Sequence, residues 1–326
     1  MRAPSFWYRP TDIRGALLSP LGSLYALATK RRVAQPAKTK TQAKTICVGN
    51  INAGGTGKTP TTIALIQQLA ERGNSVACLS RGYGGSLDGP ILVTPQHTAD
   101  QVGDEPLLLS AFAPTIVAKD RSAGAAFADT LGVDVILMDD GFQNPDVSKD
   151  ASIVVVDAVK GFGNGRTIPA GPLREPVQAG LKRADLLLSI GPQPAQKTFE
   201  EQWGKTIHCP HVTGHLVPLQ TGMVWTDLPV LAFAGIGHPE KFFATLKAVG
   251  ADIKRAEALA DHQPLTPALM ARLEAEARAL PAQLVTTEKD AVRLPDAFRS
   301  KVLALPVRLA FHDKTEINAL LDRLGL

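Results

Sequence analysis

Short runs of apolar residues alternate along this chain with longer segments in which apolar residues recur at helical spacing. Up to residue 205 this pattern predicts strands at 45–49, 75–79, 115–117, 134–138, 152–156 and 185–189, and helices at 59–72, 105–112 and 120–131. Continuously apolar strands that alternate with helices are typical of a mostly parallel sheet covered by helices on both faces. We therefore expect an α/β fold that binds its ligands at the carboxyl ends of the strands.

From residue 206 onward the spacing of the predicted elements changes. A strand-like segment at 207–218 could link two domains, and a second set of elements follows it: strands at 229–234 and 283–286, and helices at 239–248, 266–280 and 314–325. A chain of 326 residues suggests two domains of about 150 residues each. The predicted division is an N-terminal segment at 1–40, a first α/β domain at 41–205 and a smaller α/β domain at 206–326.

The N-terminal segment combines apolar residues at helical spacing with aromatic and basic residues. Leucines follow the aromatic cluster Phe6-Trp7-Tyr8, and basic residues flank the stretch: Arg2, Arg9, Arg14 and Lys30-Arg31-Arg32. This pattern predicts a helical segment that lies on an anionic membrane surface. Pro20 and two glycines weaken one continuous helix. The alternative is an amphipathic helix docked on its own domain.

Composition narrows the class of protein without identifying it. Apolar residues make up 44% of the chain and charged residues 20%, which is ordinary for a soluble globular protein. Three cysteines at unrelated positions give no disulfide framework and favour a reducing compartment. The net charge of +4 suits an anionic partner but is too small to indicate nucleic acid. No apolar run is long enough to span a bilayer, and no cleavable signal peptide is evident.

A glycine-rich turn joins the first predicted strand to the first predicted helix. It consists of Asn52, Ala53, Gly54, Gly55, Thr56, Gly57, Lys58 and Thr59. Glycines let backbone N–H groups approach phosphates, the lysine supplies a positive charge, and the threonine hydroxyl can ligate Mg²⁺. Asn52 occupies a position where the usual P-loop pattern has glycine, and asparagine tolerates a left-handed backbone. The turn therefore predicts a P-loop for a nucleotide.

Three acidic residues are candidates for the chemistry of such a site. Asp139 and Asp140 end an apolar strand, where a carboxylate can hold Mg²⁺ directly or through water. Asp104 opens a predicted helix, either as a simple N-cap or as a general base for an attacking hydroxyl. His262 precedes another helix without being needed for its cap, so it could orient or tune a carboxylate base.

Basic residues after the strand ends are candidates for binding anionic groups. Arg81, Lys119 and Arg121 all follow predicted strands and could together bind phosphate or an anionic substrate. A histidine-rich stretch at 208–215 also suggests zinc, but its spacing matches no closed four-ligand site.

An ordered set of motifs resembles the tetraacyldisaccharide 4′-kinase family of Gram-negative bacteria. No single motif is decisive, but their order between residues 45 and about 294 is specific. The set comprises Val48-Gly49-Asn50, Gly54-Gly55-Thr56-Gly57-Lys58-Thr59-Pro60, Ser80-Arg81-Gly82-Tyr83-Gly84, Gly103-Asp104-Glu105-Pro106, Asp139-Asp140-Gly141-Phe142-Gln143, Pro169-Ala170-Gly171-Pro172-Leu173-Arg174-Glu175, Asp261-His262 and Thr287-Glu288-Lys289-Asp290.

The resemblance implies a P-loop kinase that transfers the γ-phosphate of ATP to the 4′-hydroxyl of an acylated glucosamine disaccharide 1-phosphate. It assigns Lys58 and Thr59 to phosphates and Mg²⁺, and Asp139 and Asp140 to the metal. Asp104, paired with His262, becomes the base. The site lining becomes Arg81, Lys119, Arg121, Arg174 and Glu175.

The resemblance also implies a place in the cell. The N-terminal segment would meet the cytoplasmic side of the bacterial inner membrane as a peripheral contact, with no obligate protein partner. Two positions depart from the family pattern, since Asn144 and Gln263 stand where histidines are usual. These departures put any role of those histidines in doubt, and not the reaction.

Other functions remain to be weighed against a kinase. A regulatory or partitioning ATPase acting as a switch at a membrane surface has a similar loop, but it carries a lysine where this chain has Ala53. A GTPase switch needs an Asn-Lys-x-Asp guanine motif, and Lys289-Asp290 lacks the intervening residue. A peripheral membrane scaffold with an inert P-loop is a third alternative.

Overall fold

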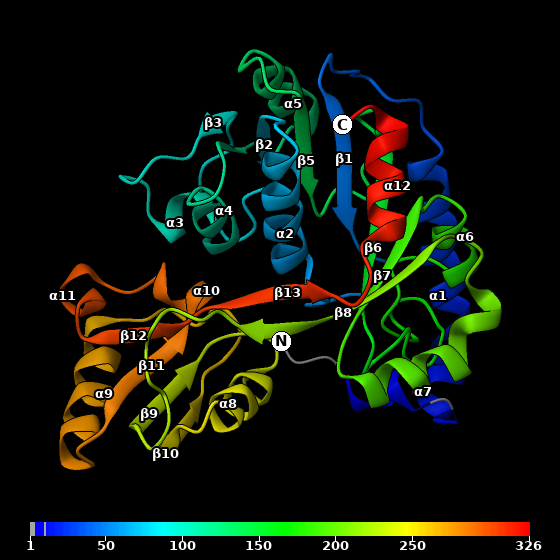
Figure 1. Ribbon diagram of the computed structural model, residues 1–326. Coiled ribbons are helices and arrows are strands. Elements are labelled where there is room, and N and C mark those ends of the chain that lie inside the picture. The colour runs from blue at the N-terminus through cyan, green and yellow to red at the C-terminus, as the bar shows by residue number, and fades with distance from the viewer. Residues whose placement is uncertain (1–3, 10) are drawn as a thin grey trace.

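A computed structural model describes residues 4–9 and 11–326 and contains a large and a small sheet (Figure 1). The large sheet has nine strands in the order β13-β8-β7-β6-β1-β5-β2-β4-β3. Their bounds are Lys44–Gly49 (β1), Val76–Ser80 (β2), Ile91–Leu92 (β3), Thr115–Val117 (β4), Val135–Asp139 (β5), Ala151–Asp157 (β6), Leu186–Ile190 (β7), His211–Pro218 (β8) and Val307–Phe311 (β13). Only the outer pairs β3–β4 and β8–β13 are antiparallel, which confirms the predicted mostly parallel sheet.

Helices cover both faces of the large sheet, as its continuously apolar strands require. One face packs against α2 (Lys58–Glu71), α4 (Asp104–Leu109) and α12 (Thr315–Leu324). The other face packs against α5 (Arg121–Asp129), α6 (Val177–Leu181) and α7 (Gln193–Trp203). The central strand β1 contributes to both cores because alternate side chains point to opposite faces, Val48 to the first and Cys47 to the second.

The register of the central strands brings two predicted motifs together. β1 runs parallel to β5, and Val48 lies opposite Asp139. The backbone N–H of Asp140 donates to the carbonyl of Val48 at 2.9 Å. The turn after β1 and the carboxylates after β5 therefore leave the same edge of the sheet side by side.

The small domain is a four-stranded parallel sheet in the order β10-β9-β11-β12. Its strands are Pro229–Ala234 (β9), Asp252–Ala258 (β10), Gln283–Thr287 (β11) and Val302–Leu305 (β12), and its helices are Pro239–Ala248 (α8), Pro267–Ala279 (α9), Glu288–Ala291 (α10) and Asp296–Arg299 (α11). Helix α8 covers one face, and α9 and α11 cover the other. The sequence pattern missed β10, because this edge strand is largely charged and exposed.

The C-terminal residues differ from the predicted division of the chain. The segment 206–326 was assigned as a whole to the smaller domain, yet β8 and β13 extend the large sheet, and α12 packs on the large domain through Ile317, Leu320 and Leu321. The chain thus enters the small domain after β8 and returns from it along β13 (Figure 1). Spacing along the sequence could not reveal this return, because strand pairing joins residues far apart in the chain.

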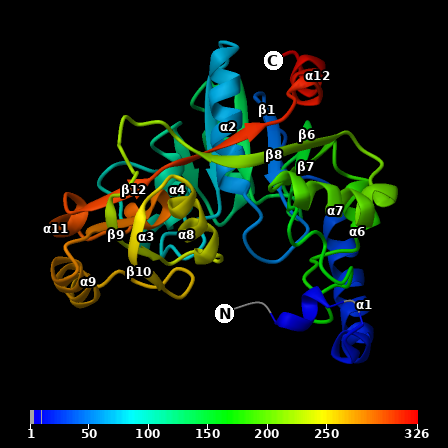
Figure 2. The same ribbon diagram turned by 60° about the horizontal axis from the view of Figure 1, so that its bottom comes forward.

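The N-terminal segment forms a short 3₁₀ turn, Ser5–Tyr8 (η1), and one helix, Ile13–Val33 (α1), which continues through Pro20. Arg2 lies outside the described residues. Helix α1 packs through its small residues Gly15, Gly22 and Thr29, and Gly22 accepts a 2.7 Å hydrogen bond from the Thr167 hydroxyl. Both views place α1 on the large domain, away from the small domain (Figures 1 and 2).

The apolar face of α1 points outward. Its exposed large side chains lie in a stripe at helical spacing: Ile13, Leu17, Leu21 and Leu24, with Tyr25 and Leu27 beside it. Leu17 is 72% exposed. Helix α1 thus does dock on its own domain, as in the alternative, but it does so through small residues and leaves its large apolar side chains exposed. The aromatic cluster was expected to belong to this surface, but Phe6 is buried and does not.

No helix in residues 4–9 and 11–326 combines the length and the apolar content that crossing a bilayer requires.

We expect a Gly22→Val substitution to loosen α1 from the large domain. A Cβ atom at this position would lie 2.9 Å from the Thr167 carbonyl oxygen, so the helix must shift. Crowding of this kind typically costs about 1–3 kcal/mol. Faster backbone hydrogen exchange across α1 would report the effect, whereas Ala28→Val on the exposed face should leave exchange unchanged. Equal exchange in both variants would contradict the described docking.

Candidate active site

Packing against Ile190 and hydrogen bonds from Asn50 fix the conformation of the glycine-rich turn after β1. Helix α2 begins at Lys58, directly after Gly57, whose φ is +99°. A Cβ atom on Gly57 would also lie 2.6 Å from the Ile190 side chain. Both the positive φ and this close approach therefore require glycine at the position. The Asn50 side-chain amide donates to the Gly54 carbonyl and the Thr56 hydroxyl at 3.2 and 3.1 Å.

The predicted nucleotide-binding residues fall into two groups. Asn52 is buried and its amide donates to the Gly161 carbonyl, while the Ala53 N–H donates to the Pro172 carbonyl at 2.7 Å. These two residues anchor the start of the loop, and their contact with nucleotide stays a prediction. Gly54 and Gly55 are exposed at its tip, where backbone can approach a ligand.

A pocket of about 290 Å³ lies between this loop and the small domain. Its lining is largely apolar, with the loop on one side and α8, β12 and α10 on the other. The large domain contributes Gly55 to Pro60, Ile63, Glu105, Leu108, Asp157, Ile190, Leu216 and Val307, and the small domain contributes Ile236 to His238, Lys241, Phe242, Thr245, Thr287 to Lys289 and Leu305. An apolar pocket beside a phosphate-type loop suits a planar base attached to phosphates.

The two carboxylates after β5 have different surroundings. Asp139 is 1% exposed, and burial, with a smaller contribution from Glu105, raises its pKa to about 7. Its Oδ1 atom has no hydrogen-bond partner among the residues that the structure describes. Asp140 Oδ1 lies 3.7 Å from Lys58 Nζ and 3.0 Å from Arg174 Nη1. Burial opposes its ionisation, but these cations lower the pKa of Asp140 overall.

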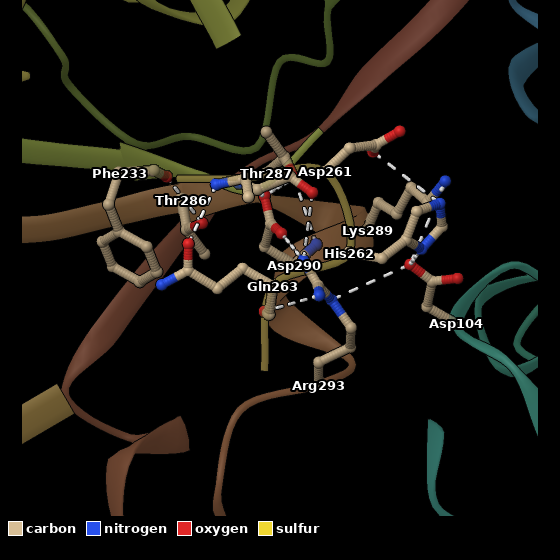
Figure 3. Close-up of polar contacts among 12 residues, drawn as sticks. Asp104, Phe233, Asp261, His262, Gln263, Thr286, Thr287, Lys289, Asp290 and Arg293 are labelled. Carbon is tan, nitrogen blue, oxygen red and sulfur yellow. Dashed lines mark hydrogen bonds and ion pairs between the residues drawn. The ribbon is translucent and has the colours of Figure 1, made fainter. Parts of the chain in front are cut away.

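Asp104 meets His262 across the domain boundary, which is the pairing that the family resemblance implied (Figure 3). Asp104 is the first residue of α4 and follows Gly103, which occupies the cap position, so the N-cap interpretation of Asp104 is wrong. Its Oδ1 atom accepts from the neighbouring Glu105 N–H at 3.1 Å. Its Oδ2 atom lies 3.0 Å from His262 Nδ1.

Two further cations of the small domain face the same carboxylate oxygen. Lys289 Nζ lies 3.9 Å and Arg293 Nε 3.8 Å from Asp104 Oδ2. Burial would raise the pKa of Asp104, but His262, Lys289 and Arg293 together lower it below its usual value. Asp104 is therefore ionised at neutral pH and available as a proton acceptor. The motif around Lys289 was noted in the sequence without a role, and nothing in the pattern singled out Arg293.

The predicted substrate-binding residues do not form one cluster. Arg81 is exposed, and Lys119 forms an ion pair with Asp88. Arg121 is 4% exposed and donates to the backbone carbonyls of Leu79 and Asp139, so it ties strand ends together.

Arg174 and Glu175 also differ from each other. Arg174 faces Asp140 at the P-loop side of the site. The buried carboxylate of Glu175 accepts from Arg183 at 2.6 and 2.7 Å and from Gln143 at 2.9 Å. Any direct contact of Glu175 with substrate stays a prediction.

The loop after β2 places an aromatic side chain beside the dyad. Tyr83 is 74% exposed, and its ring centroid lies 5.9 Å from that of His262. The histidine-rich stretch contributes no metal cluster, since no group of three potential ligands is found within the described ranges.

Replacing Asp104 with Asn should lower stability at neutral pH more than at acid pH. The folded-state pKa of Asp104 lies below its usual value of 3.8, so its charge stabilises the fold above that value. The contribution is lost as the pH falls through the folded-state pKa. We expect a difference of about 1–3 kcal/mol at neutral pH that shrinks toward about pH 3 in denaturant unfolding curves. A pH-independent difference would contradict the assignment.

Comparisons with known proteins identify the family of this chain. The sequence model of the family described as tetraacyldisaccharide-1-P 4′-kinase matches residues 14–325. Tetraacyldisaccharide 4′-kinases of Dinoroseobacter shibae and Jannaschia sp. are 60% and 57% identical, covering 99% of this chain and 98% and 99% of those proteins. LpxK from Aquifex aeolicus, solved in complex with ATP, shares the fold with a TM-score of 0.75 at 24% identity, covering 96% of this chain and 99% of that one. This chain therefore belongs to the tetraacyldisaccharide-1-P 4′-kinase family.

Proposed function

We propose that this protein transfers the γ-phosphate of ATP to the 4′-hydroxyl of a tetraacyl glucosamine disaccharide 1-phosphate, giving the 4′-phosphorylated lipid and ADP. Membership of the family supports the reaction. The observation that carries the assignment of residues is the pairing of an ionised, buried carboxylate with a histidine, Asp104 with His262, next to the P-loop pocket. A hydroxyl group that attacks a phosphate needs a base to take its proton, and the P-loop supplies the binding site for the phosphate.

The nucleotide is expected in the pocket between the two domains. Its phosphates would lie against the exposed glycines and Lys58, at the start of α2, where backbone N–H groups and the helix dipole favour anions. The adenine ring would lie in the apolar part of the pocket near Ile190 and Phe242. Lys58 is already held toward the phosphate side by Asp140, so its charge needs little rearrangement.

The residues at the edge of the sheet fit a bound Mg²⁺. The donors are hard oxygens from Thr59, Asp139 and Asp140, which Mg²⁺ prefers. The buried Oδ1 atom of Asp139 lacks a partner within the described residues, as expected of an atom kept for a ligand. When bound, the ion would neutralise charge on the phosphates.

The protein's own part in the reaction is positioning and proton transfer. Asp104 would take the proton from the sugar hydroxyl, and His262 would orient the carboxylate and share the charge change. Phosphoryl transfer asks for little covalent chemistry, so charge and geometry carry most of the rate. Arg81 and Arg174 would assist by binding anionic groups of the two substrates, and exposed Tyr83 offers a flat face to a sugar ring.

The acceptor lipid accounts for the outward stripe on α1. We place the enzyme peripherally on the cytoplasmic side of the inner membrane, with Ile13, Leu17, Leu21 and Leu24 in the headgroup region. The basic residues Lys30, Arg31 and Arg32 follow on the last turn of the helix and suit anionic headgroups. The regulatory ATPase alternative is not favoured, because the family match extends over residues 14–325 and names a kinase.

Incubation with labelled ATP, Mg²⁺ and the disaccharide lipid should yield a phosphorylated lipid. Lys58→Ala should lower turnover by at least about 10²-fold, because the phosphates lose a fixed charge. Asp104→Asn should lower kcat by about 10²–10⁴-fold and leave the KM for ATP nearly unchanged. Lys197→Ala on α7 is the matched control, since this lysine is exposed. ATP hydrolysis without lipid product would contradict the proposed function.

Introducing negative charge into the exposed apolar stripe of α1 should weaken the binding of the protein to lipid vesicles. The paired substitution Leu17→Glu and Leu24→Glu should weaken co-sedimentation with vesicles rich in phosphatidylglycerol at least tenfold, since each buried leucine contributes about 1.5–3 kcal/mol. Val224→Glu, at a side chain 74% exposed outside α1, is the control. Unchanged binding of the α1 variant would refute the membrane assignment.

A further inference from the structure

A buried ion pair lies behind the Asp104–His262 contact (Figure 3). Asp290 is completely buried, and its Oδ2 atom accepts from the Gly235 N–H at 3.0 Å and the Thr287 hydroxyl at 2.7 Å. Its Oδ1 atom is paired with Arg293. A buried carboxylate this completely paired fixes the end of β9 against the start of α10.

The Arg293 guanidinium also donates hydrogen bonds to backbone carbonyls at the loop that carries His262. Nη1 donates to the Gln263 carbonyl at 2.9 Å, and Nη2 donates to the Gly235 carbonyl at 3.3 Å. The Gly235 carbonyl also accepts from the His262 N–H at 2.9 Å. Arg293 therefore binds the loop both at the residue after His262 and at the carbonyl to which His262 is bonded.

The backbone of His262 needs such support. Its φ is +57°, a left-handed conformation that costs free energy in a residue other than glycine. The Gln263 side chain closes the same turn by accepting from the Ala260 N–H at 2.9 Å. Strain of this kind persists only where the surrounding contacts over-determine the backbone. The imidazole is thereby turned toward Asp104, which lies in the other domain.

We propose that Arg293, anchored by Asp290, is a positioning residue that holds the His262 loop against Asp104 and so sets the proton acceptor for phosphoryl transfer. The inference rests on the proposed function, and it adds a pair of residues to which no role has been assigned. Arg293 acts through His262 and through its own charge, 3.8 Å from Asp104 Oδ2, and it needs no contact with either substrate.

The shape of the side chain matters as much as its charge. The guanidinium forms a planar fork that reaches two carbonyls and a carboxylate at once, whereas a lysine ammonium is a point charge on a flexible stem. A lysine at position 293 would keep a cation near Asp104 but could not hold both sides of the loop. The two contributions can therefore be separated by substitution.

Steady-state kinetics of Arg293→Met and Arg293→Lys test the proposal with ATP, Mg²⁺ and the disaccharide lipid. We expect Arg293→Met to lower kcat about 10²-fold while the KM for ATP changes by less than about threefold, because Asp104 and His262 do not line the pocket assigned to the nucleotide. Arg293→Lys should recover part of that loss. Arg299→Met is the control, since Arg299 lies near in the fold but pairs with Asp296.

A double-mutant cycle separates positioning from general structural damage. In the Asp104→Asn background, Arg293→Met should lower kcat by less than about threefold, because its target is already gone. A similar loss in both backgrounds would overturn the proposal. If Arg293→Met folds poorly, Asp290→Asn with Arg293→Met removes the unpaired buried charge and repeats the test.

The wild-type enzyme in the same assay separates the two proposals. Absence of lipid product with the wild type would refute the proposed function itself. Normal wild-type turnover, combined with an Arg293→Met variant whose kcat stays within about threefold of it, would refute only the positioning role.

Discussion

The buried carboxylate of Asp104 lies in the large domain, but most of its polar partners come from the small domain. Asp104 is 4% exposed, and within the large domain its side chain accepts only from its neighbour Glu105 among the described residues. The groups around its second oxygen, His262, Lys289 and Arg293, all come from the small domain. A buried charge without partners is strongly unfavourable. The set of partners around Asp104 is therefore complete only when the two domains are together.

The pocket beside the P-loop lies at the same boundary, between the two domains. The P-loop forms one side of the pocket, and α8 and α10 of the small domain form the other. Across it, Lys241 of α8 lies 2.6 Å from the Asp157 carboxylate at the end of β6. The chain passes between the domains at the ends of the paired strands β8 and β13, which belong to the large sheet. The interface that forms this pocket therefore also supplies the small-domain partners of Asp104.

The small residues of α1 pack against the large domain, and this packing decides which face of the helix is exposed. Glycines let the helix approach the backbone carbonyls of Thr167 and Ala170 closely, and a hydrogen bond from the Thr167 hydroxyl holds it there. Because the small residues face the protein, the leucines are left outside. The sequence predicted a surface helix with basic flanks, but it left open which face would be exposed, since both arrangements satisfy the same spacing. Only the packed structure distinguishes them.

The sequence by itself determined the α/β class, the P-loop, and the carboxylates after β5, because these depend on local periodicity and on residues adjacent in the chain. It also named Asp104 and His262 as candidates, and the family resemblance paired them. Tertiary structure alone decided that α12 returns to the large domain, that Arg121 and Glu175 are buried in internal contacts, and that Asp290 and Arg293 support His262. The physical reason is that these contacts join side chains far apart in sequence, and no local pattern records which distant group will neutralise a buried charge.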